Sequence, residues 1–237
     1  MTAAQQLSSE ADLFEFRALA EARKYRRALI QSFCPFLRGN VLEVGAGIGQ
    51  LTEELLQVNG VEAVMAVEPN ALFASQISRV SPRLTVLQGT AADVRPDRWN
   101  AVVSVNVLEH IEDDEAELRR YAELLRIQRG ALCLFVPARP ELYAPIDKVF
   151  GHYRRYTRAE LRGKLEGAGF QVLQLNYKNL VGYFGWWLTF KVKAQTRMLP
   201  GQVRVFDRWI FPAANRLEEW LGPAPFGQSL LAVCRAG

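Results

Sequence analysis

The sequence predicts an α/β protein whose core is a seven-stranded, mostly parallel sheet with helices on both faces. The main observation is that apolar runs alternate with helix-forming segments, which is typical of parallel strands joined by right-handed crossovers. A second observation is a glycine-rich turn, Gly45 to Gly49, directly after the first apolar run and before a helix-forming segment. The length of 237 residues fits one large domain, 1–237, and we find no internal repeat or low-complexity linker.

Each expected element has a local signal of its own. Seven apolar runs are expected as strands: 40–45, 61–68, 83–89, 100–107, 130–137, 169–177 and 227–236. Helices are expected over about 10–37, 49–58, from Asn70 onward, 113–127 and 156–169. Thr157 is placed to cap the last of these helices, and Glu160, three residues on, completes a capping box. The chain therefore begins with a helical segment, residues 1–38, before the alternation starts.

The stretch between the last two expected strands, residues 179–225, is rich in aromatic residues. An unstructured loop of this length would be unusual in a compact domain. We therefore expect helices there. The nearest candidate for a membrane span, "LVGYFGWWLTF", is shorter than the eighteen or so residues required and is followed by Lys191 and Lys193.

Composition describes an ordinary globular protein, with 49% hydrophobic and 23% charged residues. The net charge of +4 is uneven, because residues 151–237 hold 13 basic and 5 acidic residues, while residues 1–150 hold 16 and 20. The basic C-terminal third favours an anionic substrate or surface, or is solvated charge without a partner. The N-terminus lacks the pattern of a secretory signal, and three distant cysteines match no metal spacing. We expect a cytoplasmic protein without a metal.

The stretch "VLEVGAGIGQLT" places a carboxylate, Glu43, inside an apolar run two residues before the first of three alternating glycines. Glycines at such a turn let a ligand approach the backbone and the free N–H groups of the following helix. Gln50 stands where the dinucleotide fingerprint G-x-G-x-x-G needs its third glycine. A buried carboxylate is costly unless it is paired. Glu43 is therefore expected either to face a cationic ligand or to be held by nearby backbone N–H groups.

This stretch resembles motif I of the class I S-adenosylmethionine-dependent methyltransferases, with the pattern acidic-x-G-x-G-x-G. The resemblance continues in order through "VMAVEPN", "VLQGTAADV" and "SVNVLEHIED", the last being similar to the small-molecule branch of the family. It covers about residues 25–170 and implies a Rossmann-like fold with S-adenosylmethionine as cofactor. It also implies that the last two strands pair, so that residues 179–225 form a helical cap inserted between them.

The resemblance implies a set of cofactor contacts. They are Tyr25, Glu43, Gly45, Ala46, Gly47, Gly49, Glu68, Pro69, Gly89, Thr90, Ala91, Asn106 and Val107. Within this set Glu68 would bind the ribose hydroxyls, or it would merely begin a helix in which Pro69 suits the first turn. Many relatives have Asp in place of Thr90 to accept from the adenine amino group, so that contact is weaker here.

The loop after the fifth strand, "ARPELYAPIDKVFGHYRRYT", resembles a "D…GH-x-R-x-Y-T" segment of many relatives. It follows the carboxyl end of a strand, where parallel sheets bind ligands, so we interpret it as a wall of the active site. His152 is the leading candidate for a general base, with Asp147 orienting it, because imidazole titrates near neutral pH. The alternative is that His152 and the arginines only fix the loop. His110 is open as base, substrate contact or structural residue.

Substrate contacts are expected from the same loop and from the insertion. They are Tyr153, Arg154, Arg155, Tyr183 and Trp186. Trp186 and its neighbour Trp187 point in different directions on a helix, so at most one of them lines a pocket. Aromatic and basic residues together suit an amphipathic acceptor or a membrane surface, and ordinary helix packing is the alternative.

The predicted function is methyl transfer from S-adenosylmethionine to O or N of a small-molecule, saccharide or lipid-linked acceptor, as in small-molecule or natural-product biosynthesis. An RNA methyltransferase is one alternative, suggested by a pI of about 9.1, but no "[DN]-P-P-[YFW]" motif follows the fourth strand. A dinucleotide-dependent oxidoreductase and a non-catalytic scaffold are further alternatives. We expect no nucleic-acid partner, and we consider peripheral membrane contact as a possible interaction. The oligomeric state is open.

Overall fold

The computed structural model describes residues 21–79, 81–195, 200–222 and 224–237. The expected N-terminal helical segment, residues 1–38, therefore lies partly outside the described residues. Its described part holds α2 (Arg23–Phe33), followed by a 3₁₀ turn, Cys34–Phe36. Leu29, Ile30 and Phe33 of α2 are buried.

The sheet has seven strands in the order β3-β2-β1-β4-β5-β7-β6. Their bounds are β1 Gly39–Val44, β2 Val61–Glu68, β3 Leu84–Gln88, β4 Ala101–Val105, β5 Ala131–Pro137, β6 Phe170–Lys178 and β7 Ser229–Ala236. The first five strands pair in parallel, and β7 runs antiparallel between β5 and β6. The predicted fold class is confirmed, and the paired last strands are confirmed with it.

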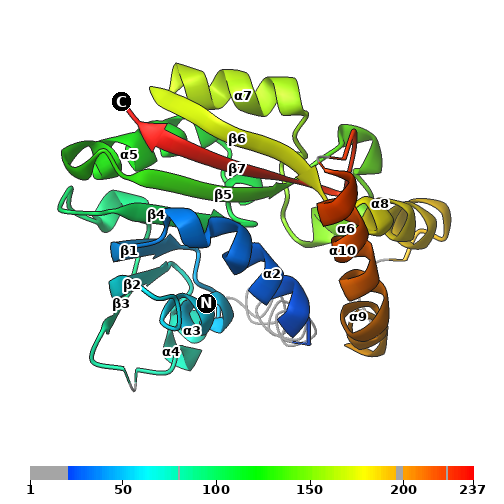
Figure 1. Ribbon diagram of the computed structural model, residues 1–237, viewed down its shortest axis with the longest axis horizontal. Coiled ribbons are helices and arrows are strands. Elements are labelled where there is room, and N and C mark those ends of the chain that lie inside the picture. The colour runs from blue at the N-terminus through cyan, green and yellow to red at the C-terminus, as the bar shows by residue number, and fades with distance from the viewer. Residues whose placement is uncertain (1–20, 80, 196–199, 223) are drawn as a thin grey trace, which may run out of the picture.

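Helices cover both faces of the sheet (Figure 1). Their bounds are α3 Gln50–Leu55, α4 Ala71–Gln76, α5 Asp114–Leu125, α6 Pro145–Val149, α7 Arg158–Gly167, α8 Leu180–Trp186, α9 Pro200–Val205 and α10 Phe211–Leu221. One apolar core lies between the sheet, α5 and α7, and a second lies between the sheet, α2 and α3. Burial of these apolar side chains is the main stabilising contribution, at about 25 cal/mol for each Å² removed from water. Thr157 caps α7 as predicted, because its hydroxyl accepts from the backbone N–H of Glu160 at 3.2 Å.

The segment between β6 and β7 is helical, as predicted. A π-helical turn, Trp187–Val192, continues α8, and another, Phe206–Ile210, joins α9 to α10. In Figure 1 it lies with α6 beyond the carboxyl ends of β4 and β5. None of the helices in the described part of the chain combines the length and the apolar character needed to span a bilayer.

The loop after β5 is more ordered than the sequence predicts. It contains a 3₁₀ turn, Pro140–Leu142, and the helix α6. Proline stands at the first position of each, where its missing N–H is not needed. The carboxylate of Asp147 accepts from the backbone N–H of Ala144 at 2.9 Å and so caps α6 from inside its first turn. The candidate catalytic loop is therefore built on a short helix that is too brief to give a periodic sequence signal.

Candidate active site

The turn after β1 has the backbone conformation that its glycines allow. Gly45, Gly47 and Gly49 all have positive φ angles, 72°, 56° and 84°. The N–H groups of Gly45 and Ala46 donate to the carbonyl of Val67, at 2.8 and 3.0 Å, which fastens the turn to the end of β2. A β-carbon at Gly45 would lie 2.3 Å from Cγ2 of Val107, so the turn packs directly against the end of β4.

Glu43 lies under this turn, in the middle of the sheet, and is 2% exposed. The hydroxyl of Thr52, in the first turn of α3, donates to its carboxylate at 2.5 Å. Burial raises the pKa of Glu43 to about 8, and the Thr52 hydrogen bond offsets part of that increase. The hydrogen-bond partner of this carboxylate is therefore a side chain of α3. The sequence analysis expected either a cationic ligand or backbone N–H groups instead.

Glu68 ends β2 and is tied to two loops at once. Its carboxylate accepts from the N–H of Gly47 and from the N–H of Asn70, both at 2.9 Å. Each oxygen keeps one lone pair for another donor. The cap of α4 is Asn70, whose side chain accepts from the N–H groups of the first turn, so Glu68 does not begin that helix. Pro69 is exposed beside it.

The segment after β3 holds a residue that the sequence reading missed. Asp93 accepts from both the N–H and the hydroxyl of Thr90, at 2.8 and 3.0 Å, and these bonds lower the pKa of Asp93. Gly89 packs closely on this carboxylate, because a β-carbon there would lie 2.8 Å from Asp93 Oδ2. Ala91 is fully buried. The pattern Thr-x-x-Asp was visible in the sequence. It places the carboxylate of Asp93 beside Thr90, at the position where many relatives have Asp.

Two further expected cofactor contacts lie in different places. Asn106 follows β4 with a positive φ of 53° and an exposed side chain, at the same sheet edge as the glycine turn. Tyr25 packs with ring centroids 6.1 Å from Phe135 and 4.9 Å from Phe211. Burial raises the pKa of Tyr25 well above its usual value. The described ring contacts of Tyr25 are thus with β5 and α10, and none of them joins it to the glycine turn.

His152 and Asp147, the expected base and its orienting residue, are in direct contact. Nδ1 of His152 lies 2.9 Å from Oδ1 of Asp147. The same carboxylate oxygen accepts from Nε of Arg155 at 2.9 Å. Burial alone would raise the pKa of Asp147, but the His152 hydrogen bond and the Arg155 charge outweigh it and lower the pKa. Asp147 is therefore an ionised carboxylate that holds the imidazole by one nitrogen.

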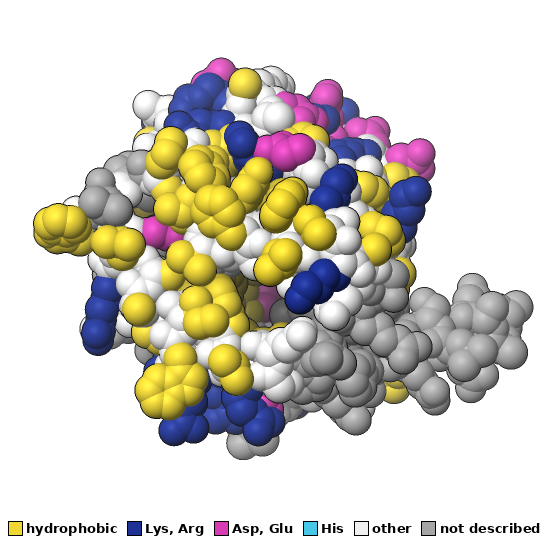
Figure 2. All heavy atoms as spheres, turned by 90° about the vertical axis from the view of Figure 1, so that its right-hand side faces the viewer, with side chains coloured by type: hydrophobic (Ala, Val, Ile, Leu, Met, Phe, Trp, Pro, Cys, Tyr) yellow, Lys and Arg dark blue, Asp and Glu magenta, His cyan; other side chains and the backbone are white. Residues whose placement is uncertain are grey.

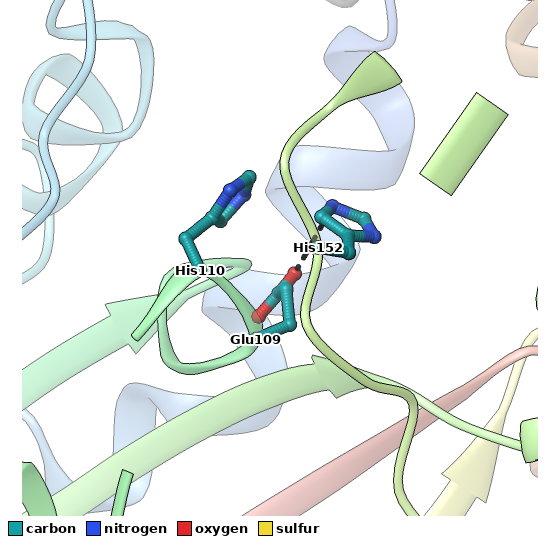
Figure 3. A group of neighbouring side chains, drawn as sticks. All are labelled: Glu109, His110 and His152. Carbon is teal, nitrogen blue, oxygen red and sulfur yellow. Dashed lines mark ion pairs between the residues drawn. The ribbon is translucent and has the colours of Figure 1, made fainter. Parts of the chain in front are cut away.

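Glu109 and His110 approach His152 from the turn after β4, Leu108–His110 (Figure 3). The ring centroids of His110 and His152 are 4.6 Å apart, with an angle of 82° between the rings. Oε1 of Glu109 lies 3.9 Å from Nε2 of His152. Burial raises the pKa of Glu109 to about 8. It lowers the pKa of His110 to about 4, with a smaller contribution from His152. Glu109 was not singled out from the sequence.

Arg154 and Arg155 are both engaged within the protein. Arg155 is 3% exposed, and its guanidinium lies 4.5 Å from the ring centroid of Trp186. Arg154 pairs with Asp114 of α5 at 2.8 Å. Tyr153 is 54% exposed. Of the three expected substrate contacts in this loop, only the tyrosine side chain is largely open to solvent, because ion pairs fix the two arginines.

Trp186 fastens the helical segment between β6 and β7 to the loop after β5. Its ring is buried, and its indole N–H donates to the carbonyl of Leu142 at 3.2 Å. Trp187 is 47% exposed, so the two tryptophans do point in different directions. Tyr183 packs edge-on against Phe226, at 5.2 Å between centroids.

Comparison with known proteins identifies the chain. A family model described as a methyltransferase domain matches residues 14–175, about two thirds of the sequence. The chain belongs to this methyltransferase family. A search of curated proteins gave no match.

Solved methyltransferase structures share the fold over nearly the whole chain. A Thermotoga maritima protein described as a possible histamine N-methyltransferase is 17% identical, with a TM-score of 0.64 and 97% of each chain covered. The Burkholderia thailandensis 1,6-didemethyltoxoflavin-N1-methyltransferase, which holds S-adenosylhomocysteine, is 19% identical, with a TM-score of 0.60 and 98% and 86% of the two chains covered. A chain from the Haloferax volcanii complex of the Trm112 methyltransferase activator with a methyltransferase is 17% identical, with a TM-score of 0.63 and coverage of 96% and 94%.

The protein is thus an S-adenosylmethionine-dependent methyltransferase, and its predicted class, enzyme type and cofactor are confirmed. The residues at the glycine turn fit that cofactor. Gly45, Gly47 and Gly49 adopt positive φ angles and have no side chains, so a ligand can approach the backbone of the turn closely. Two carboxylates, Glu43 and Glu68, lie below and beside it, which suits a ligand carrying positive charge and a ribose.

Proposed function

We propose that this methyltransferase transfers the methyl group to O or N of a small-molecule, saccharide or lipid-linked acceptor. The observation that carries the proposal is the contact between His152 and Asp147 beside the turn after β4. A positioned imidazole with one nitrogen held by a carboxylate is a typical arrangement for removing a proton from a nucleophile. Parallel sheets bind ligands at the carboxyl ends of their strands, so this pair and the glycine turn share one edge.

On the cofactor side, the expected contacts remain as a proposal. The turn at Gly45–Gly49 cradles the methionine part, Glu43 lies below it, and Glu68 accepts from the ribose hydroxyls through its free lone pairs. Asp93 or Thr90 receives the adenine amino group, with Pro69 beside it. Asn106 and Val107 complete the wall from β4. When bound, S-adenosylmethionine supplies a methyl group on a positively charged sulfur.

On the acceptor side, His152 removes the acceptor's proton through Nε2, because Nδ1 is held by Asp147. Asp147 is a positioning residue, and Arg155 fixes it in turn. His110 and Tyr153 line the acceptor's approach, and Trp186 acts through Arg155 rather than by touching substrate. The alternative is that His152 only fixes the loop.

Residues 179–225 are proposed as a cap that also meets a membrane surface. Figure 2 shows hydrophobic side chains gathered on this face, with Lys and Arg side chains around them. The large exposed apolar residues among the described residues of the cap are Val181, Phe184, Trp187, Leu188, Val192, Val205, Trp209, Ile210, Leu217 and Trp220. Basic residues on the same segment, among them Lys193 and Arg208, suit anionic headgroups. A cytoplasmic enzyme with this face would reach a lipid-linked acceptor without spanning the bilayer.

An activity test uses purified enzyme, S-adenosylmethionine and pooled acceptors, with release of S-adenosylhomocysteine as the readout. Hydroxyl- and amine-bearing small molecules, saccharides, lipid-linked intermediates and RNA form separate pools. Turnover confined to the RNA pool would overturn the proposed acceptor class. Calorimetry with the cofactor and with nicotinamide dinucleotides tests the cofactor side independently, and no dinucleotide binding is expected.

A membrane test uses liposomes with and without anionic lipid. The double variant Trp209→Ser with Trp220→Ser should lose co-sedimentation, and added salt should weaken binding of the unmodified protein. Ile127→Ser is the matched control, because Ile127 is 57% exposed but lies in the turn after α5, outside the cap. Equal liposome binding by all three proteins would remove the membrane from the proposal.

A protein partner is a second candidate, suggested by one of the similar structures. The Haloferax volcanii structure is a complex with an activator of methyltransferases. If this chain needs such a subunit, the pure chain would show no methyl transfer in the acceptor assay. Methyl transfer would appear after a cell extract from the organism that makes the chain is added. Activity of the pure chain at a typical turnover of about 1 to 1,000 per second would exclude that need.

A further inference from the structure

Glu109, His110 and His152 form a cluster of metal-ligating groups. They come from two segments, the turn after β4 and the chain after α6, which lie side by side (Figure 3). One ligand atom from each residue lies within 4.8 Å of those of the other two. No other cluster of this kind is present in the described part of the chain. The sequence predicted no metal, on the ground that its three distant cysteines match no metal spacing.

Glu109 is the residue that points to a missing ligand. It is fully buried, and neither of its carboxylate oxygens has a partner of hydrogen-bond geometry among the described residues. Its own backbone N–H and the positive charge of Arg155 favour the ionised form, but burial outweighs them. The nearest ring nitrogen, Nε2 of His152, is 3.9 Å away, too far for a hydrogen bond. Leaving a buried carboxyl group without a partner costs about 1 to 3 kcal/mol or more. A cation between the carboxylate and the imidazoles would supply the partner.

The two imidazoles are held as metal ligands usually are. Nδ1 of His152 is bonded to Asp147, so Nε2 keeps its lone pair for the side of Glu109. A backbone hydrogen bond at Phe150 holds the ring of His110. Metal-binding histidines commonly have their second nitrogen fixed in this way by a carboxylate or a backbone carbonyl. Arg155 in turn fixes Asp147 at 2.9 Å, so the support extends one residue further out.

We propose that Glu109, His110 and His152 bind one divalent first-row transition-metal ion of the Zn²⁺ type, with a position left open toward the acceptor. Two nitrogens and one carboxylate oxygen are a typical ligand set of a catalytic zinc site, whereas Mg²⁺ and Ca²⁺ prefer oxygen ligands. Ligand atoms around zinc lie about 3.3 Å apart at bond lengths of about 2.0–2.2 Å. The cluster would therefore contract slightly around the ion.

This inference rests on the proposed function and gives the cluster a chemical role. An acceptor hydroxyl at the open position would lose its proton more easily, as metal-bound water does. The oxygen–methyl bond then forms while the methyl–sulfur bond breaks, with the electron pair left on sulfur and the proton released to solvent. His152 would hold the cation in this form of the enzyme instead of taking the proton itself. The acceptor class would be hydroxyl compounds, because a hydroxyl oxygen can occupy the one open position on the ion.

The test measures metal binding directly, with untagged full-length protein and no acceptor. Because Cys34 is the exposed cysteine, all proteins carry Cys34→Ser to remove an adventitious ligand. After chelation and dialysis, Zn²⁺ and Co²⁺ are titrated by calorimetry, and the visible spectrum reports the Co²⁺ geometry. One ion per chain is expected, together with a rise in melting temperature that depends on metal concentration.

Two variants and one control make the test specific. Glu109→Gln keeps the volume of the side chain, and His110→Ala removes a side chain of the turn after β4 that lies outside the apolar cores, so both should fold. Each should weaken metal binding by about tenfold to a hundredfold or more. Glu43→Gln is the control, since it changes a buried carboxylate whose pKa is also raised to about 8, but which Thr52 satisfies. Absence of stoichiometric binding, or equal binding by all four proteins, would overturn the metal site.

The outcomes also separate this inference from the proposed function. Methyl transfer that stays complete in metal-free enzyme, together with no metal binding, would overturn the metal site and leave the methyltransferase role intact. Stoichiometric binding that the variants abolish supports the site, even if no hydroxyl acceptor is methylated and the proposed acceptor class fails.

Discussion

Two buried carboxylates differ in whether the protein supplies a hydrogen-bond donor for them. Glu43 lies in β1, and Glu109 lies in the turn after the neighbouring strand β4. Both are almost fully buried, and burial raises the pKa of each to about 8. Glu43 has a donor from its own fold, the hydroxyl of Thr52 at 2.5 Å. Both oxygens of Glu109 are without a hydrogen-bond partner among the described residues. The buried carboxylate under the glycine turn is thus satisfied within the protein, whereas the one beside His152 is not.

The largest expected effect is on the glycine-turn side. Gly45→Ala should reduce S-adenosylmethionine affinity by at least about a hundredfold, because the new β-carbon meets Val107 at 2.3 Å in a left-handed backbone. Gly163→Ala is the matched control, since nothing lies within 4 Å of that position in α7. It should leave cofactor binding unchanged and slightly stabilise the helix. Calorimetric titration measures both variants, and equal affinities would mean that the turn does not cradle the ligand.

The next effect is on the acceptor side and should leave the cofactor side untouched. His152→Ala should lower turnover by about a hundredfold or more, with cofactor affinity nearly unchanged, because a positioned imidazole is lost. Lys148→Ala, an exposed change on α6, is the control for general damage to the loop. Steady-state kinetics and calorimetry on the same samples give the two readouts. A matching loss in His110→Ala alone, with His152→Ala active, would transfer the role to His110.

Glu68 tests whether a carboxylate that already accepts two hydrogen bonds within the protein also binds the ribose of the cofactor. Glu68→Ala should weaken S-adenosylmethionine binding about tenfold to a few hundredfold, because two hydrogen bonds to the ribose are lost at about 1 kcal/mol or more each. Glu62→Ala changes an exposed residue on the same strand and is the control. Adenosylhomocysteine, which lacks the sulfonium charge, should show the same loss. Unchanged affinity for both ligands would mean that Glu68 only holds Gly47 and Asn70.

The last effect is on the stability of the protein without cofactor, and it leaves ligand affinity aside. The folded pKa of Glu43 is about 8, above its ordinary 4.5, so the folded state keeps a proton that the unfolded state loses between these values. Stability from this group therefore falls as pH rises from about 4.5 to 8. Glu43→Gln cannot titrate, so the variant should gain stability relative to the unmodified protein across that window, on the order of a few kcal/mol. Urea unfolding at both ends of the window measures this, and parallel pH profiles would contradict it.

The sequence predicted the sheet well, because buried parallel strands are continuous apolar runs and each is bounded by a local signal. The cap of α7 at Thr157 is a further local feature that the pattern identified. The helix α6 was missed because five residues are too few to show a helical period. Local signals thus determine most of the fold.

The candidate site depends more on contacts between distant residues. The pairing of His152 with Asp147 was expected, since five residues separate them, and the structure has it. Arg155 was expected to touch substrate, but it lies under Trp186 from the cap, a contact that no local pattern encodes. Glu109 follows an apolar run and resembles a solvated charge after a strand. That it is buried without a hydrogen-bond partner depends on the loop packed over it, which is tertiary information.

The antiparallel placement of β7 has a consequence for the segment that precedes it. Lys178, the last residue of β6, pairs with Ser229, the first of β7, so the chain leaves and re-enters the sheet at one point. Lengthening a closed loop costs little, about 0.6 kcal/mol for each doubling. The segment between these two strands can therefore change in length with little effect on the stability of the sheet or of the glycine turn.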